Sequence, residues 1–466
     1  MDFISKIENI NKTVNDFVWG PYMLLLIVGT GIFFTFRTNF FQVRKFAFSM
    51  KETLFKIFDK SVDDSDEILS EGDITPFQAL STALAGTVGT GNIAGVATAI
   101  ATGGPGAVFW MWVSAFFGMM TKFSEVVLAI EYREKNDEDN WVGGPMYYIK
   151  NGLGLKWLAT LFAIFGAIAA FGIGNMVQSN SVANAMKATF NINPLITGII
   201  LTIATALVIL GGLKRIASVA EKLVPFMALF YIIAAIAVLI IQFSEVPVAF
   251  QLIFTHAFTP SAAIGGFVGA TVMRAMRFGV ARGVFSNEAG LGSAPIAHAV
   301  AKTDHPVKQG LWGIFEVFAD TIIICTLTAL TIISTGAWTL LDDSGKQLSG
   351  AALTTAAFSH ALSSLGGIIV AISILLFAFS TILSWSYYGE KCVEFLFGSR
   401  FNKLYRIMFI PLILLGSISS LELVWDIADT LNGLMAIPNL IGLLGLSTVV
   451  IKLIKDYFDN KVYEHN

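Results

Sequence analysis

The stretch LAGTVGTGNIAGVA, residues 84–97, places four glycines, two threonines and an asparagine inside an apolar segment. Glycine in a helix interior costs about 1 kcal/mol relative to alanine, so the helix is expected to break here. Unwound backbone at membrane depth is tolerated where it is buried in protein or lines a cavity. The free N–H groups at the start of a second half-helix suit a carboxylate, and the freed carbonyls suit a cation.

The glycines of this stretch also suggest two other sequence patterns. Gly91 and Gly95 form GxxxG, a common pattern at the contacts between membrane helices. A dinucleotide-binding fingerprint is excluded, because no strand precedes the glycines and the segment is apolar enough to cross a membrane. Thr87, Thr90 and Asn92 add polar groups that simple packing does not require, and they favour the broken helix.

Ionisable residues inside other apolar segments form a second candidate set. They include Glu125, and charge at membrane depth is costly and usually paired. At 1.5 Å per residue, Arg277 and Glu316 each lie about 8 residues from the cytoplasmic ends of their segments, while Arg274 and Asp320 lie about 11 or 12 residues in. The equal depths predict two ion pairs, which either form a cytoplasmic gate or brace the helices. Direct binding of a substrate carboxylate by Arg274 is a third interpretation.

The composition indicates the class of protein to which these residues belong. Of 466 residues, 55% are hydrophobic and only 14% are charged, and the mean hydropathy is +0.71. This balance predicts a polytopic helical membrane protein. The net charge of −3, without a basic run, gives no indication of nucleic-acid binding. The two cysteines, Cys325 and Cys392, exclude a disulfide framework and a Cys/His metal site.

Windows of about 20 apolar residues predict eleven transmembrane helices. The first is expected to be a retained span rather than a signal peptide, because the residues before it are polar and mixed in charge. The predicted spans are 18–36, 76–101, 105–131, 157–186, 194–212, 223–243, 263–285, 308–335, 366–390, 407–421 and 432–451.

The distribution of Lys and Arg predicts the orientation. One set of alternate loops and the C-terminal tail holds 23 of the 30, the opposite side holds four, and Lys122, Arg274 and Arg277 fall inside spans. The positive-inside rule then places the N-terminus outside and the C-terminus in the cytoplasm.

An internal repeat relates the second span to the seventh. At an offset of 184 residues, Thr75-Pro76 aligns with Thr259-Pro260, and eight of 23 positions are identical. The two spans run in opposite directions, so two inverted five-helix units are expected, built around broken helices that meet at mid-membrane. The predicted organisation is 1–75 with the first span, repeats over 76–243 and 244–451, and a tail over 452–466.

Four longer motifs carry a family resemblance. GGPGAVFWMWVSAFFG (103–118) closely resembles the signature of the alanine or glycine:cation symporters, the sodium:alanine symporter family. GGPMYYI (143–149), GNMVQSN (174–180) and FSNEAGLGSAPIAHA (285–299) are similar to the same family, so the resemblance covers nearly the whole chain. It implies sodium-coupled uptake of alanine or glycine on a leucine-transporter-type fold of five plus five helices, with one extra N-terminal helix.

The resemblance also implies a sodium site. Similar transporters use a hydroxyl pair such as Ser380 and Thr381, and the carbonyls of Ala85, Val88 and Phe377 would complete the oxygen ligands of this hard cation. The alternative is that both hydroxyls bond carbonyls of their own helix, which is routine in membrane helices.

The expected substrate site draws on four spans. The amides of Gly89, Thr90 and Gly91 would hold the carboxylate, and the repeat predicts a second break at 269–273 whose carbonyls would hold the ammonium group. Large side chains around a short pocket would suit a substrate with one methyl group, although plain helix or lipid packing explains several of them equally well. The remaining predicted residues are Phe165, Ile168, Gly172, Asn175, Gln178, Gly269, Ala270, Thr271, Met273, Met276, Thr381 and Trp385.

The sequence therefore predicts a secondary active transporter of the plasma membrane that imports alanine or glycine with Na⁺ by alternating access. A proton-coupled amino-acid transporter, with Glu316 or Asp320 as relay, is the main alternative, and a channel is a further one. No nucleophile–base pair or HExxH motif indicates an enzyme. The expected partners are the amino acid, the ion and the lipid bilayer, and the oligomeric state stays open.

Overall fold

The computed structural model describes residues 3–55, 71–259, 268–342, 345–419 and 422–464, and these residues are mostly helical. The chain begins with α1 (Phe3–Val18) and α2 (Pro21–Arg37), followed by the short helices α3 (Phe41–Arg44) and α4 (Phe46–Met50) and the π-turn η1 (Lys51–Phe55). Pro21 occupies the first turn of α2, where its missing N–H costs nothing.

The first predicted repeat contains a broken helix and four further spans. Between α9 and α11, the two-residue strands β1 and β2 form an antiparallel hairpin. The elements are α7 (Pro76–Thr87), η2 (Gly91–Gly95), α8 (Val96–Gly103), α9 (Gly106–Glu131), β1 (Glu134–Lys135), β2 (Trp141–Val142), α10 (Pro145–Leu153), α11 (Lys156–Phe171), η3 (Gly172–Met176), α12 (Val177–Phe190), α13 (Pro194–Ile209) and α14 (Gly212–Ile241).

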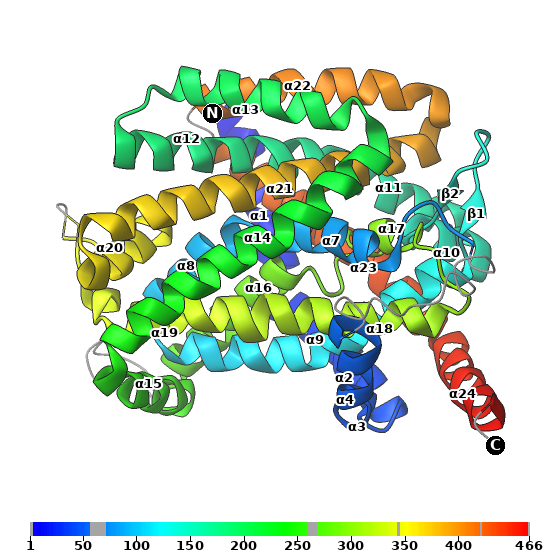
Figure 1. The fold of residues 1–466 in the computed structure, drawn as a ribbon, viewed down its shortest axis with the longest axis horizontal. Coiled ribbons are helices and arrows are strands. Elements are labelled where there is room, and N and C mark those ends of the chain that lie inside the picture. Colours follow the sequence, from blue (N-terminus) through cyan, green and yellow to red (C-terminus); the bar gives the residue numbers. More distant parts are fainter. Residues whose placement is uncertain (1–2, 56–70, 260–267, 343–344, 420–421, 465–466) are drawn as a thin grey trace.

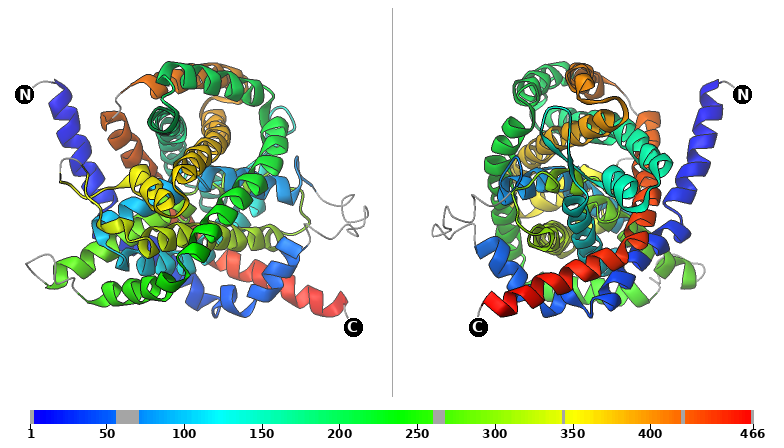
Figure 2. Two further views of the ribbon diagram at one scale, coloured as in Figure 1. Left: turned by 60° about the vertical axis from the view of Figure 1, so that its left-hand side comes forward. Right: turned by 90° about the vertical axis from the view of Figure 1, so that its right-hand side faces the viewer.

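The second predicted repeat, residues 244–451, begins at η4 (Phe243–Glu245) and α15 (Val246–Phe258). Its predicted end lies inside α24, which runs along the outside of the molecule (Figure 2). The elements are α16 (Val268–Asn287), α17 (Pro295–His298), α18 (Pro306–Val317), η5 (Phe318–Cys325), α19 (Thr326–Ser334), η6 (Ala337–Thr339), α20 (Gly350–Leu362), α21 (Ser364–Phe397), η7 (Ser399–Phe401), α22 (Asn402–Ile418), α23 (Glu422–Gly445) and α24 (Ser447–Glu464).

The helices form two groups around the broken helix (Figure 1). In one group α16 and α18 both pack on α9, and in the other α13 packs on α22 while α11 and α12 pack on α21. Helix α7 lies between the groups and contacts both α18 and α21. The break in α7 therefore faces helices of each group.

The break of the second predicted span lies where the glycines predicted it. Thr75 and Gln78 form a capping box and Pro76 is the first helical residue, so α7 has a defined start. The helix ends at Thr87, Val88 leaves helical geometry, and the two half-helices meet at a bend of 48°. The continuation begins as a π-turn at Gly91–Gly95.

The predicted break of the seventh span is wrong in position. Helix α16 is continuous from Val268 to Asn287, and the chain unwinds over 288–294 before α17. Glu288, Gly290 and Gly292 all have positive φ there, and Pro295 starts the next helix. The sequence match at an offset of 184 residues reflects similar composition of the two segments. It does not align the break of α7 with the break after α16. Arg282 lies inside α16, within the predicted span 263–285.

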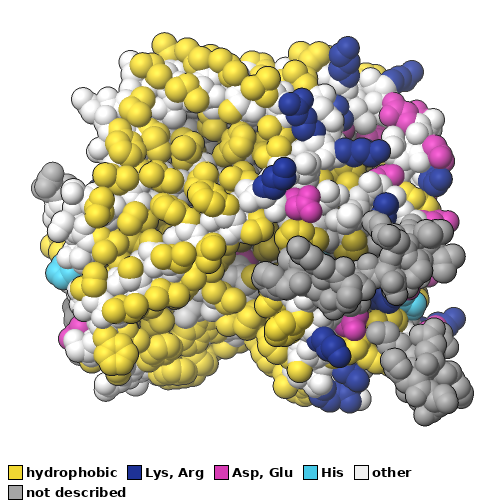
Figure 3. All heavy atoms as spheres, in the orientation of Figure 1, with side chains coloured by type: hydrophobic (Ala, Val, Ile, Leu, Met, Phe, Trp, Pro, Cys, Tyr) yellow, Lys and Arg dark blue, Asp and Glu magenta, His cyan; other side chains and the backbone are white. Residues whose placement is uncertain are grey.

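Helices occupy all eleven predicted spans within the described residues. Nine candidates meet the length and hydropathy of a membrane span when the bent pair counts as one, α13 is a shorter apolar helix, and the count of eleven stays a prediction. The predicted last span, 432–451, in fact crosses from α23 into α24. Figure 3 shows hydrophobic side chains over most of one face, with Lys and Arg gathered at the end that holds β1, β2 and α10.

Candidate substrate and cation site

The predicted cation ligands come together between α7 and α21. The Ser380 hydroxyl donates to the carbonyl of Ala85 at 3.2 Å and to that of Phe377 at 2.8 Å. The Thr381 hydroxyl donates to Phe377 at 2.9 Å, and Val88 is buried at the adjoining end of α7. Both hydroxyls thus form hydrogen bonds within α21, and Ser380 also forms one to α7. Hydroxyl and carbonyl oxygens are the ligand types of hard cations.

The break itself is a narrow backbone passage beside the same hydroxyls. A side-chain carbon added at Gly89 would lie 2.7 Å from Oγ1 of Thr381. The amide of Gly89 donates to Oδ1 of Asn92 at 2.9 Å, so it is already engaged. The hydroxyl of Thr90 donates to Oε1 of Gln178 at 3.1 Å, which ties the break to α12. Gln178 therefore lies beside the break, and its part in substrate binding stays a prediction.

A cavity of about 690 Å³ ends at this break. It is lined by Thr90 and Gly91 at its inner end and by α12, α16, α20 and α21 along its walls. Its other end lies near Thr189 and Gly350, on the side that the charge count assigns to the exterior. Arg282 lines this cavity too. The broken helix is thus reached from the predicted outer face.

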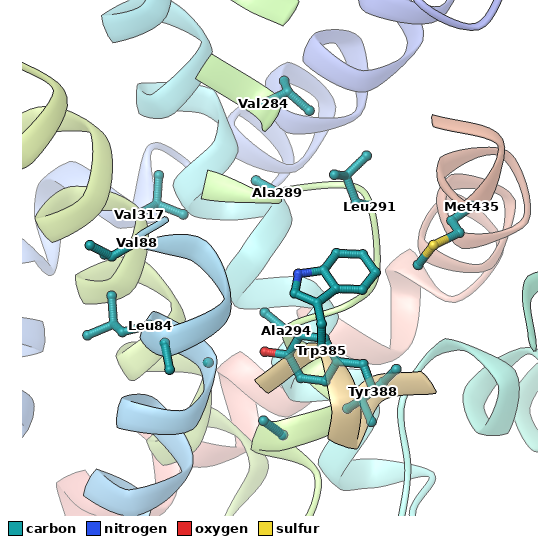
Figure 4. Close-up of a cluster of buried hydrophobic side chains, with 14 of the residues drawn as sticks. Leu84, Val88, Val284, Ala289, Leu291, Ala294, Val317, Trp385, Tyr388 and Met435 are labelled. Atoms are coloured by element: carbon teal, nitrogen blue, oxygen red, sulfur yellow. The ribbon is translucent and has the colours of Figure 1, made fainter. Parts of the chain in front are cut away.

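Trp385 closes the region on the opposite side of the break. It is buried, and Figure 4 shows its ring between Leu84 and Val88 of α7 and Met435 of α23. Its indole nitrogen donates to Glu288 at 3.0 Å, in the unwound segment after α16. A carbon added at Gly174 would lie 2.3 Å from Cβ of Trp385, so η3 approaches the tryptophan through a glycine.

Several predicted substrate residues lie elsewhere. Ile168 is 48% exposed and Met273 is 63% exposed, while Met276 lines a surface groove beside Met273. Asn175 turns away from the break and donates to the carbonyl of Phe409 at 2.7 Å. Phe165 is half-buried against the core. Gly172 begins the η3 turn that packs on α21, and the side chains at Gly269, Ala270 and Thr271 fall outside the described residues.

Asp320 lies next to the break without its predicted arginine. Its carboxylate accepts hydrogen bonds from Asn92 at 2.6 Å, Ser286 at 2.9 Å and Thr321 at 2.8 Å. Arg274 instead lines a groove on the outside of α16, so the predicted pair Arg274–Asp320 is wrong. Within the described part of the chain, the recorded partners of Asp320 are all neutral.

Glu316 is fully buried and has two cationic or ionisable partners. Lys122 lies 3.3 Å from its Oε1, and His298 Nε2 lies 3.0 Å from its Oε2. The predicted pair with Arg277 is wrong, since Arg277 lies 3.8 Å from Asp16 in α1. Helix α9 lies between α16 and α18, so equal depth did not place the two side chains on facing surfaces.

Sequence reasoning missed a buried polar frame around the unwound segment. Glu125 accepts hydrogen bonds from the Gly290 amide at 3.0 Å and from Asn439 at 2.6 Å. Glu288 also accepts a short hydrogen bond from Ser293. The pattern EAGLGSAP, with two glycines and a proline after an apolar helix, carried a signal for this second break.

A family profile described as the sodium:alanine symporter family matches residues 4–466. The chain belongs to the sodium:alanine symporter family. It is 54% identical over 463 residues to the sodium/alanine symporter AgcS of Methanococcus maripaludis, covering 98% of each chain. It is 41% identical to the probable sodium/glutamine symporter GlnT of Bacillus subtilis, covering 98% of this chain and 91% of that protein.

The fold of this symporter is also found in a distant transporter. A crystal structure of the Eremococcus coleocola manganese transporter matches with a TM-score of 0.53 at 15% identity, covering 83% of this chain and 81% of that one. The leucine-transporter-type helical fold is therefore established, and the protein is a multi-pass membrane transporter rather than an enzyme.

A backbone strap closes the side of the symporter opposite the cavity. Residues 71–74, before α7, pair with residues 300–303, after α17. Arg133 at the end of α9 donates to the carbonyls of Ala299, Ala301 and Glu71 at 3.1, 2.8 and 2.8 Å. Burial raises the pKa of Asp73, whose carboxylate accepts the Trp141 amide at 2.9 Å. The two broken helices are thus joined at this end.

Proposed function

We propose that this symporter imports small neutral amino acids, alanine and glycine, together with Na⁺. The observation that carries the proposal is the meeting of Ser380 and Thr381 with the carbonyls of Ala85 and Phe377, directly beside the break that ends the cavity. An ion bound there would have ligands from both helices, so it would stabilise one position of α7 relative to α21. Such a link between ion and helix position is what coupling requires.

The ion ligands in this proposal are the two hydroxyl oxygens and the carbonyls of Ala85, Val88 and Phe377. When Na⁺ binds, the hydroxyl hydrogens turn away from the carbonyls and the same oxygens face the ion. The approach of Gly89 to Thr381 supports a direct effect of the ion on the substrate region.

The substrate carboxylate in this proposal binds the amides of Thr90 and Gly91, because the Gly89 amide is engaged by Asn92. Phe285 borders Gly91, and a side-chain carbon on that glycine would lie 3.3 Å from its ring. The carbonyls at the end of α16 and in the unwound segment are the proposed partners of the ammonium group. Trp385 and Gln178 limit the space left for a side chain, which favours a small amino acid.

Alternating access in this proposal opens the described cavity to the exterior and closes the cytoplasmic side with the strap of residues 71–74 and 300–303. The excess of Lys and Arg at the strap end supports a cytoplasmic location for it. The N-terminus is then outside, the C-terminus is cytoplasmic and the membrane is the plasma membrane.

Purified protein in vesicles tests the coupling ion and the substrate. Uptake of labelled alanine should require an inward Na⁺ gradient, and unlabelled glycine should compete with it. Competition by glutamine, the amino acid in the name of one relative, should be weak because of its longer side chain. Uptake that is equal in choline and sodium media would overturn sodium coupling.

Proton coupling is the second candidate, and of the two predicted relay residues the geometry favours Asp320 over Glu316. Glu316 has Lys122 and His298 as partners, whereas the recorded partners of Asp320 are neutral and include Asn92 at the break. Alanine uptake driven by a pH gradient without Na⁺, and abolished in Asp320→Asn, would support this candidate. Uptake that ignores the pH gradient would exclude it.

A further inference from the structure

A groove on the membrane face of the protein contains two arginines that the transport site does not use. It lies between α2, α9 and α16 and has a volume of about 630 Å³, within the usual range of ligand sites. Its apolar lining includes Leu25 and Val28 from α2 and Trp110 from α9, and Arg274 and Arg277 enter it from α16. The volume and the apolar walls suit an acyl chain.

The charges in the groove are unbalanced. Arg277 lies 3.8 Å from Asp16, whose side chain is 63% exposed, while the described residues show no acidic partner within 4 Å of Arg274. The exposed side chains beside the arginines are apolar, with Leu25 at 71% and Met273 at 63%. Two guanidinium groups and one carboxylate leave one positive charge, and a positive charge facing the hydrocarbon region is costly unless an anion accompanies it.

The groove lies near one membrane interface. Pro21 at its rim is the first residue of α2, and Trp110 is four residues after the start of α9. Tryptophan is enriched at the level of the lipid headgroups. Arg274 and Arg277 line the same groove from α16 as Pro21 and Trp110 do from α2 and α9. Long arginine side chains carry their charge toward the headgroup level while their stems stay on apolar surface.

We propose that this groove binds one anionic phospholipid. Its phosphodiester is held by Arg274 and Arg277, and an acyl chain lies along Leu25, Val28 and Val113. One negative charge neutralises the excess positive charge, whereas a zwitterionic lipid supplies no net charge. The arrangement fits phosphate recognition by guanidinium pairs. It would tie α2 to α16, which carries the second break.

Native mass spectrometry of the full-length, delipidated protein tests the proposal with phosphatidylglycerol as the probe. Phosphatidylglycerol should bind at least fivefold more tightly than phosphatidylcholine, and Arg274→Gln with Arg277→Gln should remove that preference. Val113→Trp fills the groove and keeps both charges, so it should weaken both lipids. Arg400→Gln with Lys403→Gln removes two exposed cations elsewhere and should leave the preference unchanged.

Three outcomes would overturn the proposal. The first is equal binding of the two lipids by the unaltered protein. The second is an unchanged preference in the Arg274/Arg277 double variant, and the third is full competition by inorganic phosphate, which would show an anion site without a lipid. If the double variant instead changes a dimer into a monomer and lipid has no effect, the groove is occupied by a second copy.

Discussion

The proposed cation site depends on two neighbouring hydroxyls, of which Ser380 forms hydrogen bonds to both α7 and α21. Ser380 reaches the carbonyl of Ala85 in α7, whereas Thr381 reaches only Phe377 in its own helix. The family resemblance predicted this pair as ion ligands, and the structure places it beside the carbonyls of Ala85 and Phe377. The predicted ion pairs Arg274–Asp320 and Arg277–Glu316 were wrong, since depth along a helix does not say which way a side chain points.

Removing the Thr381 hydroxyl should raise the Na⁺ concentration for half-maximal alanine uptake severalfold, because one ion ligand is lost. The matched control is Ser386→Ala. Ser386 is buried in the same helix and, within the described residues, its one side-chain hydrogen bond goes to Leu383, so its loss should leave the sodium curve unchanged. Unaltered sodium dependence in Thr381→Ala would take this residue out of the proposed site.

Lys122→Met should destabilise the protein by leaving Glu316 buried without its ammonium partner. Breaking a buried ion pair costs about 3–5 kcal/mol in soluble proteins. The melting temperature in detergent should fall clearly, and adding Glu316→Gln should recover part of the loss. Lys403→Gln is the control, because Lys403 is exposed on α22. A Lys122→Met protein as stable as the control would show that the pair contributes little.

At the scale of elements, the sequence predicted helices far better than their breaks. The break of α7 was predictable, because four glycines in one apolar stretch have a direct physical cost. The break after α16 was misplaced, since an apparent sequence match overrode the local signal of Gly290, Gly292 and Pro295.

The break in α7 offers a matched pair of glycines. A carbon added at Gly89 would lie 2.7 Å from Thr381, whereas one added at Gly95 would meet nothing within 4 Å. Gly89→Ala should therefore reduce alanine binding by at least tenfold, and Gly95→Ala should bind almost normally. Isothermal titration of the purified variants, with melting temperature as a folding check, gives the comparison. Normal binding by a folded Gly89→Ala protein would place the substrate elsewhere.

The strap joins both broken helices at one end, and Arg133 donates to two of its carbonyls, those of Glu71 and Ala301, and to that of the adjoining Ala299. Arg133→Gln should loosen this closure and increase access from that side. A cysteine at the buried position Ser293 reports it through the rate of maleimide labelling in inside-out vesicles. The rate should rise severalfold over that in Arg400→Gln, which removes an exposed charge. Equal rates would mean that Arg133 does not control opening.

The whole molecule has a cavity on one side of the broken helices and a buried polar frame with a strap on the other. This asymmetry is what one state of an alternating-access transporter requires. Composition and family motifs predicted the class and the fold. They left the open side undetermined, because it depends on how two groups of helices tilt against each other and not on any residue type.

The assignment of the cavity to the exterior depends on the predicted orientation of the chain in the membrane. The native cysteines Cys325 and Cys392 are buried, so a new surface cysteine is the main target for a membrane-impermeant maleimide. Lys346 is exposed at the end of the molecule where the cavity opens. Lys308 lies at the end that holds the strap, in the first turn of α18. In whole cells Lys346→Cys should be labelled at once, and Lys308→Cys only after the membrane is opened. The reverse pattern would turn the cavity toward the cytoplasm and would make the described state an inward-facing one.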